Sequence, residues 1–314
     1  MVEISIEEME KARERLQGRI HKTPVIQCEA INKLAGANVH FKCEHLQKTG
    51  SFKSRGALNA VLGVKEERGD DCQGVLTHSS GNHGQALAWA ALQCQMPCCV
   101  VVPANAPQLK KDGMSEYKTD IVLCGNTVKD RETTCAEMQK KLGYDVVEPF
   151  NNAYMINGHA SCAAEIIEQV PEADAVFVAV GGGGLASAIG MYIGEKRPDI
   201  KVYLVEPEAK QLKSYLNEDK LPEYDTVNTV ADGIRVLRVG DLCKPILAKY
   251  AAGNIISVTE EEIREALKLI WTRTKQRVEP TAAVPLAGLL KLKDKARCPV
   301  VILCGGNVDL SFVP

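Results

Sequence analysis

A buried strand that runs into four consecutive glycines constrains the fold of this chain more than any other feature of its sequence. Residues 175–180 are continuously apolar and predict a buried strand, and Leu185 begins a segment typical of a helix start. The residues between them are Gly181, Gly182, Gly183 and Gly184. Because glycines leave successive backbone N–H groups uncovered, this turn can bind an anion, and the helix N-terminus adds partial positive charge. We call residues 181–185 the glycine cup.

The glycine cup does not have the sequence of a common nucleotide site. No Gly-Lys-Ser or Gly-Lys-Thr follows the glycines, as a P-loop requires. Position 186 is alanine, so the dinucleotide-binding glycine pattern is not cleanly met. A nucleoside triphosphate at the cup is therefore disfavoured.

Lys53 is a candidate for covalent chemistry, in the segment Ser-Phe-Lys-Ser-Arg-Gly at residues 51–56. A free lysine has a pKa near ~10.4, so its amine is useful near pH 7 only if its surroundings lower that value. Arg55 lies two residues away, and a neighbouring guanidinium is expected to disfavour a second positive charge. Desolvated lysines of this kind form Schiff bases with carbonyl cofactors. Taken alone, however, such a lysine is most often a solvated surface charge.

A third segment, Ser-Ser-Gly-Asn-His-Gly at residues 79–84, is on its own an ordinary turn signal. Together with Lys53 and the glycine cup, it supplies the parts that a site for pyridoxal 5′-phosphate (PLP) needs. The protein must hold the phosphate, the aldehyde and the ring of that cofactor separately. The three segments together therefore predict one PLP site.

Longer matching words link the chain to a known family. They are KTGSFKSRGALNA at 48–60, THSSGNHGQA at 77–86, the four glycines, VADG at 230–233, EPTA at 279–282 and LCGGN at 303–307. In this order they resemble the fold-type II PLP enzymes of the serine racemase and serine/threonine dehydratase family. The resemblance extends over nearly the whole chain.

The hydrophobic pattern favours an α/β fold. Strand-like runs alternate with helical patterns, as expected for parallel sheets. These runs cover residues 75–77, 99–102, 121–123, 175–180, 202–205 and 300–303. The resemblance implies the tryptophan synthase β-like arrangement, with two parallel-sheet domains and the cofactor between them. It places a small domain at residues 69–147, inserted in a large domain of residues 1–68 and 148–314.

The resemblance also implies which residues bind the cofactor. Lys53 would carry it as a Schiff base, with Phe52 and Asn82 beside its ring, and the glycine-cup backbone would hold its phosphate. Cys304 would face the pyridine nitrogen, where a thiol leaves that nitrogen largely neutral. The alternative for Cys304 is a small residue at a buried strand end.

The implied substrate-binding residues lie mostly in the third segment. They are Ser79, Ser80, Asn82, His83 and Arg131. A packed core imidazole is the alternative for His83, and a charged helix surface is the alternative for Arg131.

Ser80 separates racemase from dehydratase chemistry. A racemase needs a second acid or base on the face opposite Lys53, so that the α-carbon can be reprotonated from the other side. Dehydratases of this family commonly carry alanine at the position of Ser80. We therefore predict a PLP-dependent racemase that interconverts L- and D-serine, with accompanying β-elimination to pyruvate and ammonia. A turn hydroxyl at Ser80, an L-serine/L-threonine ammonia-lyase and a catalytically silent PLP-binding protein stay open as alternatives.

Two effector sites of the family are only partly preserved. Its divalent-cation site uses a glutamate that matches Glu206 and an aspartate six residues later, where this chain has Leu212. The lost carboxylate predicts weak or absent activation by Mg²⁺. The residues that match a nucleotide site are Lys48, Thr49, Gln85, Tyr117, Lys275 and Asn307. Cys28 and Glu29 replace two serines there, so activation by ATP stays open.

The exact substrate is less constrained than the chemistry. A substrate-side serine of the racemases is replaced by Val236, which lies near Arg235 and Arg238. The three-serine loop of the aspartate racemases is absent, since residues 150–152 are Phe-Asn-Asn.

Composition points to small molecules as partners. The chain has 314 residues, 45% of them hydrophobic, which is enough to bury the core of one large or two ordinary domains. With a formal net charge of −2 and no long basic block, nucleic acid and membranes are not expected partners. Residues 1–20 lack the apolar core of a signal peptide, and no apolar run approaches ~18 residues, so we expect a cytoplasmic protein. The family implies a homodimer.

The twelve cysteines include no Cys-x-x-Cys pair, and several lie in apolar runs such as residues 97–102. We expect reduced, mostly buried thiols and neither disulfides nor a zinc site.

Overall fold

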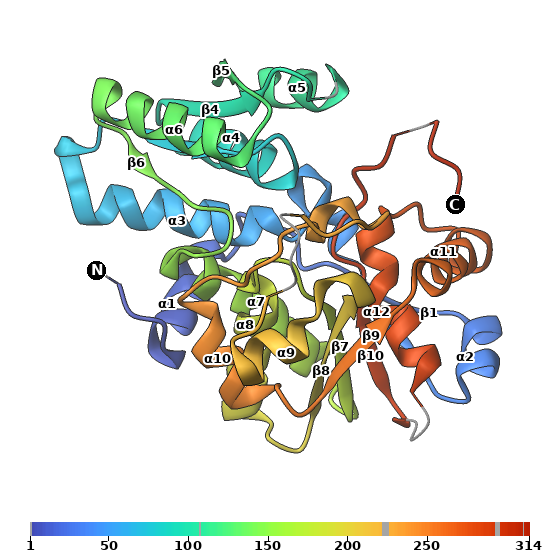
Figure 1. The fold of residues 1–314 in the computed structure, drawn as a ribbon. Coiled ribbons are helices and arrows are strands. Elements are labelled where there is room, and N and C mark those ends of the chain that lie inside the picture. The colour runs from blue at the N-terminus through green and yellow to red at the C-terminus, as the bar shows by residue number, and fades with distance from the viewer. Residues whose placement is uncertain (1, 107, 222–225, 293–295, 310) are drawn as a thin grey trace.

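The computed structural model contains two sheets that come from different parts of the chain (Figure 1). It describes residues 2–106, 108–221, 226–292, 296–309 and 311–314. The larger sheet has six strands in the order β1-β2-β10-β7-β8-β9. In it β1 pairs antiparallel with β2, and the other pairs are parallel. The smaller sheet has four strands in the order β5-β4-β3-β6, all parallel.

The strands and helices alternate along the chain, as parallel pairing requires. The strands of the larger sheet are β1 (Val25–Gln27), β2 (His40–Lys42), β7 (Ala175–Ala179), β8 (Lys201–Pro207), β9 (Ile255–Val258) and β10 (Pro299–Ile302). Those of the smaller sheet are β3 (Val75–His78), β4 (Cys98–Pro103), β5 (Asp120–Cys124) and β6 (Asp145–Val146). The helices are α1 (Ile6–Leu16), α2 (Glu29–Ala35), α3 (Lys53–Arg68), α4 (Asn82–Gln93), α5 (Gln108–Ser115), α6 (Val128–Leu142), α7 (Ala153–Gln169), α8 (Gly184–Lys196), α9 (Leu212–Glu218), α10 (Cys243–Tyr250), α11 (Glu260–Leu269) and α12 (Pro280–Lys291).

The α/β prediction is confirmed, and each of the six predicted runs forms a strand. Four further strands, β1, β2, β6 and β9, have two to four residues each and were not predicted. The sequences of these strands give too little periodicity to be recognised, and each strand is held by pairing with a neighbouring one.

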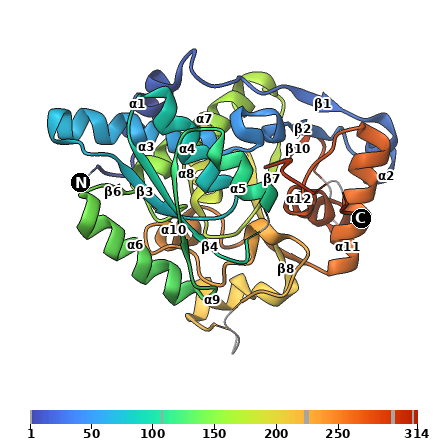
Figure 2. The same cartoon turned by 90° about the horizontal axis from the view of Figure 1, so that it is seen from above.

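Helix α3 lies between the two sheets and packs on α7 on one side and α4 on the other (Figure 1). Seen from above, the elements of the smaller sheet overlie α8 and α10 (Figure 2). The smaller sheet uses residues 75–146 only, whereas the larger sheet uses residues on both sides of that segment. The domain limits at 69 and 147 stay a prediction.

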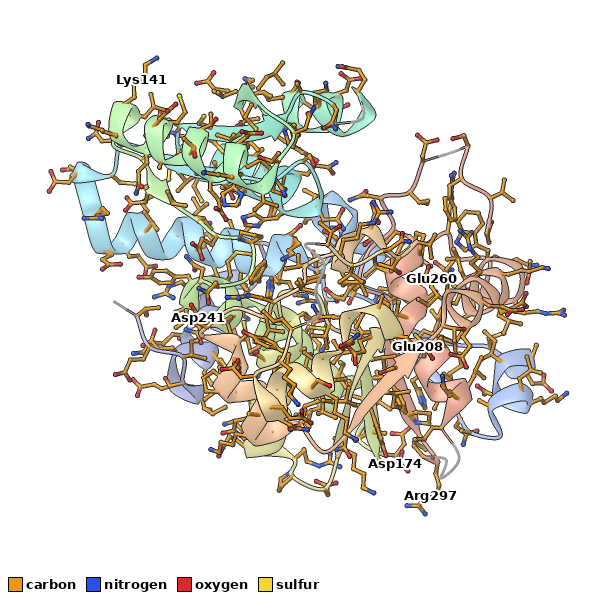
Figure 3. All side chains as sticks on the ribbon, in the orientation of Figure 1. Lys141, Asp174, Glu208, Asp241, Glu260 and Arg297 are labelled. Atoms are coloured by element: carbon orange, nitrogen blue, oxygen red, sulfur yellow. The ribbon has the colours of Figure 1, made fainter. Side chains whose placement is uncertain are left out.

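The parallel strands of the larger sheet point toward the smaller sheet. Asp174 precedes β7 and Arg297 precedes β10, and Figure 3 shows both at the end of the molecule remote from the smaller sheet. The Asp174 carboxylate accepts a hydrogen bond from the backbone N–H of Arg297 at 2.7 Å, which aligns these two strand starts. The carboxyl ends of β7 and β10 therefore lie at the other edge, where open α/β sheets commonly bind ligands.

Most of the cysteine side chains are buried, as predicted. All twelve cysteines are free, and nine of them are buried. Within the described residues, no helix is long and apolar enough to cross a membrane.

Candidate active site

The glycine cup lies at the carboxyl end of β7, where α8 begins. Gly184 is the first residue of α8, and Gly183 is its N-cap, with φ of +94°, in the region that favours glycine. A Cβ on Gly182 would lie 2.1 Å from the ring of Phe150, and one on Gly183 would lie 2.9 Å from Cβ of Cys243. Space thus excludes side chains from the cup, and the first N–H groups of α8 stay available for an anion.

Lys53 begins α3, and its side chain reaches the segment that packs on the cup. Its Nζ donates a hydrogen bond to the carbonyl of Pro149, and the next residue, Phe150, packs its ring against the glycines. Desolvation lowers the pKa of Lys53 to about 8, although the thiols of Cys243 and Cys304 offset part of this effect. The structure therefore brings Lys53 to the glycine cup with an amine that loses its proton far more readily than a free lysine.

Arg55 does not cause this shift, which corrects the expectation from the sequence. Its guanidinium lies in a fully buried position and donates to Glu44 and Glu165, each at 2.7 Å. The ammonium of Lys42 also bonds to Glu165. We call these four residues, Lys42, Glu44, Arg55 and Glu165, the charge cluster. Because its two cations and two carboxylates balance, the charge cluster leaves burial as the factor that lowers the pKa of Lys53.

Phe52 and Cys304 flank Lys53. The backbone N–H of Phe52 donates to the carbonyl of Cys304 at 3.1 Å, and Nζ of Lys53 lies 5.1 Å from the Phe52 ring centroid. The Cys304 side chain is buried just beyond β10, and burial raises the pKa of its thiol well above the usual value. Glu279 lies near enough to raise it further, so Cys304 is a neutral thiol.

His159 was not predicted as a site residue, yet it packs directly on Phe52. Their ring centroids are 4.8 Å apart in an edge-on contact, and His159 is fully buried. Burial lowers the pKa of His159 well below its usual value, and the charge of Lys53 lowers it further. A histidine in the middle of a helix gives no sequence signal of this kind.

Asn82 connects the smaller sheet to the larger one. Its side-chain NH₂ donates to the carboxylate of Glu279 at 3.0 and 3.1 Å, and its oxygen accepts from Asn307 at 2.9 Å. Asn307 also donates to the carbonyl of Thr49 at 2.8 Å. Glu279 was recognised only as part of a matching word, although its place directly before the first proline of α12 marks a fixed helix start.

Ser79 and Ser80 form the turn between β3 and α4. The Ser79 hydroxyl accepts a hydrogen bond from the N–H of Gly81 at 3.3 Å. The hydroxyl of half-buried Ser80 makes no hydrogen bond with any residue of the described part of the chain. Ser80 therefore does not serve as a turn hydroxyl in this structure.

His83 and Arg131 are the remaining predicted substrate residues. The Nε2–H of buried His83 donates to the carbonyl of Val147 at 2.9 Å, and burial lowers the pKa of His83 to about 3. His83 is thus neutral and is packed like a core imidazole. Arg131 lies on α6, and burial lowers the pKa of His78 at the end of β3, with the charge of Arg131 lowering it further. The roles of His83 and Arg131 toward a substrate stay predictions.

The residues matched to a nucleotide site are only partly brought together. Thr49 and Asn307 are joined by the bond described above, and Lys48 lies in the same turn as Thr49. Gln85 belongs to α4, and Tyr117 packs beside the core that α4 helps to form. Lys275 ends the π-helical turn that follows α11.

Glu206 does not fit a hard divalent cation here. One of its oxygens accepts from the N–H of Leu212 at 2.6 Å and the other from the Ser257 hydroxyl at 2.9 Å. Burial raises the pKa of Glu206 to about 7, and the charge of buried Lys210 offsets part of this effect. Within the described residues, no group of three or more His, Cys, Asp or Glu side chains is placed to hold a metal.

PLP does fit the described residues. The glycine cup, which side chains would block, can take the phosphate of the cofactor. Lys53 offers an amine of lowered pKa to the aldehyde of the cofactor. Phe52, Asn82 and Cys304 converge on the same region through the contacts above.

Comparison with known proteins agrees with this fit. Residues 16–305 match the family described as pyridoxal-phosphate dependent enzyme. The chain is 39% identical over 320 residues to a serine racemase of Dictyostelium discoideum, covering 100% of this chain and 98% of that protein. It is also 39% identical to a β-hydroxyaspartate dehydratase of Paracoccus denitrificans, covering 98% of each. The crystal structure of a PLP-dependent aspartate racemase superposes with a TM-score of 0.95 at 37% identity, covering 100% of this chain and 99% of that one.

Three observations indicate the same family: the match to its sequence model, the two-sheet fold, and the lysine beside the glycine cup. The fold is shared with a solved racemase along the whole chain. The chain belongs to the family of pyridoxal-phosphate dependent enzymes, with the α/β fold of fold type II.

Proposed function

We propose that this enzyme interconverts L- and D-serine and, as a companion reaction, eliminates water from serine to give 2-aminoacrylate, which water then hydrolyses to pyruvate and ammonia. One observation carries the proposal. The Lys53 amine, with a pKa of about 8, lies at the glycine cup, while the Ser80 hydroxyl makes no hydrogen bond with any described residue. Racemisation needs a proton donor or acceptor on each face of the α-carbon, and these two groups supply the pair.

Bound PLP would supply an electron-withdrawing ring that acidifies the α-carbon of the substrate. The N–H groups of the glycine cup bind the phosphate, and Phe52 and Asn82 orient the ring. Nζ of Lys53 takes the α-proton from one face, and Oγ of Ser80 gives or takes a proton on the other. The neutral thiol of Cys304 provides no charge to the ring nitrogen.

Recognition of the substrate carboxylate is assigned to the turn between β3 and α4. The N–H groups at the start of α4 carry partial positive charge, which favours an anion. Since His83 is neutral, backbone N–H groups near Ser80 and Asn82 carry this task in our proposal, with Ser79 and Arg131 at its edge.

Elimination is favoured as the companion reaction by a specific comparison. The dehydratase of Paracoccus denitrificans is as similar to this chain, at 39% identity, as the serine racemase of Dictyostelium discoideum. Both reactions begin with removal of the α-proton, so Lys53 serves both, whereas only racemisation needs Ser80.

The direct test incubates the protein with L-serine, PLP and Mg-ATP and measures D-serine by chiral chromatography together with pyruvate. Formation of D-serine supports the proposal. Pyruvate without D-serine would identify an ammonia-lyase, and PLP binding without turnover of any amino acid would identify a catalytically silent PLP protein.

The assembly and effectors belong to the same proposal. We assign a cytoplasmic homodimer with little response to Mg²⁺ alone. Activation by ATP stays open, through the residues that match a nucleotide site: Lys48, Thr49, Gln85, Tyr117, Lys275 and Asn307. Light scattering tests the dimer, and titration of chelator-treated enzyme with nucleotide and metal separately tests the effectors.

A further inference from the structure

Lys210 is a fully buried lysine that has no part in the site described above. It ends the short turn after β8 and is among the largest side chains with no exposed surface. Glu208, labelled in Figure 3, begins the same turn. Nζ of Lys210 donates hydrogen bonds to the carbonyl of Val236 and, at 3.2 Å, to that of Leu237. A buried ammonium is costly unless it is paired, so its partners indicate its role.

The counter-charge is the carboxylate of Glu206, which is also fully buried. Its position is fixed, because its two oxygens accept hydrogen bonds from Leu212 and Ser257. Burial raises the pKa of Glu206 to about 7 and lowers that of Lys210 to about 8, and each charge offsets part of the effect on the other. The ammonium thus bonds to two carbonyl oxygens, and the Glu206 carboxylate acts on it only through its charge.

The two carbonyls belong to the segment that covers the glycine cup. We call residues 233–243 the cover loop. The N–H of Gly240 in this loop donates to the carbonyl of Gly182 at 2.9 Å. The side chain of Ile234 lies 3.0 Å from the place of a Cβ on Gly181, and Val239 lies 3.4 Å from that place on Gly183. Any shift of the cover loop therefore changes the shape of the cup.

We propose that the ammonium of Lys210 is a built-in cation that holds the cover loop on the glycine cup through the carbonyls of Val236 and Leu237. Tethering the charge to the chain makes the closed cup independent of any exchangeable cation. Lys210 is a positioning residue, since it acts through the carbonyls of Val236 and Leu237. The inference rests on the proposed role of the cup in holding the PLP phosphate.

The buried state of Lys210 can be tested in the unmodified protein. Reductive methylation of the folded protein, read by peptide mass spectrometry, compares Lys210 with exposed Lys213. We expect Lys213 to be modified rapidly and Lys210 at least about tenfold more slowly, because the buried Nζ of Lys210 meets the reagent only when the surrounding chain opens. Equal rates for the two lysines would overturn the proposal.

The function of the ammonium is tested with Lys210→Ala and Lys210→Met. Because Glu206 can take up a proton, neither variant is left with a buried unpaired charge. We expect the affinity for PLP, followed by the change in absorbance on titration of the apoprotein, to fall about tenfold in both, as for loss of hydrogen bonds from a charged donor. Proteolytic cleavage within the cover loop should increase in parallel. The control is Lys244→Met on neighbouring α10, which removes a half-buried lysine that pairs with exposed Asp219, and this variant should bind PLP normally.

Rescue by small cations separates a tether from simple packing. Ammonium or methylammonium should restore PLP affinity and protect the cover loop in Lys210→Ala, which has room for the ion. Lys210→Met fills that room and should not respond. Unchanged PLP affinity in both variants, or equal cation responses in the two, would overturn the proposal. Failure of the wild-type enzyme to form D-serine would contradict the proposed reaction but leave these binding measurements unaffected.

Discussion

Two neighbouring sets of titratable groups, both reached from the start of α3, behave in opposite ways. In the charge cluster, Arg55 is held by Glu44 and Glu165, and its pKa is raised well above the usual value. Lys53, two residues earlier, bonds to the carbonyl of Pro149 and pairs with no carboxylate of the described residues, so burial lowers its pKa to about 8. Residues two apart on a helix point in different directions. One turn of helix can therefore hold a permanent charge and a removable one.

The difference lies in the partners and not in the depth of burial. Desolvation acts on both side chains, and only ion pairing overcomes it. The same rule explains the two buried histidines near Lys53. Neither His83 nor His159 pairs with a carboxylate in the part of the chain that the structure describes, and the pKa of each is lowered by burial and by the charge of Lys53. Around the glycine cup the protein thus keeps bases neutral, while the charge cluster anchors α3 from the other side.

Of the substitutions that test this comparison, the removal of Lys53 should have the largest effect on activity. With Lys53→Ala we expect turnover of serine to fall by about 10³-fold, because the proton transfer on one face is lost. Borohydride reduction of the wild-type holoenzyme followed by peptide mapping should place the pyridoxyl label on Lys53. A label on another lysine, above all on Lys42 of the charge cluster, would contradict the assignment.

Ser80→Ala tests whether protons are transferred on both faces of the substrate α-carbon. We expect D-serine formation to fall by about 10²-fold or more, since the second proton donor is lost. Pyruvate from L-serine should persist, because elimination needs only the Lys53 face. Both products are measured in one assay, so each reaction is the control for the other. An equal loss of both would show that Ser80 binds the substrate or supports the turn.

Arg55→Met breaks the charge cluster and should act on stability. It leaves Glu44 and Glu165 with Lys42 as their cation, and removing one partner of a buried ion pair typically costs about 3 kcal/mol or more. Urea unfolding of the apoprotein measures this cost. Arg68→Met, which removes an exposed partner of Asp145, is the control and should unfold like the wild type. If Arg55→Met were as stable as the control, the charge cluster would not anchor α3.

The pH dependence of cofactor binding probes Lys53 in the wild type. Its pKa is lowered, so the neutral amine accumulates as pH rises through about 8 and not near 10.5. The rate of PLP binding to the apoprotein should rise roughly fivefold between pH 7 and 8 and level off above pH 9. A rate that still climbs in proportion to hydroxide at pH 9.5 would mean that Lys53 is not desolvated.

The sequence predicts the elements of this site better than their connections. The glycine cup, Lys53 and the turn at residues 79–84 are recognisable because glycine spacing and turn residues are local signals. The cause assigned to the Lys53 pKa was wrong, because the direction in which Arg55 points depends on Glu44 and on Glu165, 110 residues later. Long-range pairing of this kind leaves no local pattern.

The sequence did not predict the short strands or the burial of Lys210, for a related reason. Strand β6 has two residues and exists because β3 offers it an edge. Lys210 has the sequence of an ordinary surface lysine, and only the arrival of Val236 and Leu237 makes it a buried one. The loss of a metal carboxylate at Leu212 was predicted, but not the group that lies beside Glu206 instead.

The smallest expected effect is that of Cys304→Ser, which keeps a small neutral group next to the site. The thiol of Cys304 is neutral, because burial and the nearby charge of Glu279 raise its pKa well above the usual value. A serine hydroxyl is neutral too, so we expect serine turnover to change by no more than about threefold. Cys304→Asp is the informative companion, since it would place a second carboxylate near Glu279 and allow a charge at the cofactor ring. We expect that variant to turn over more slowly and to alter the visible absorbance of the bound cofactor. If stopped-flow spectra and rates of Cys304→Asp matched the wild type, Cys304 would not contact the cofactor ring.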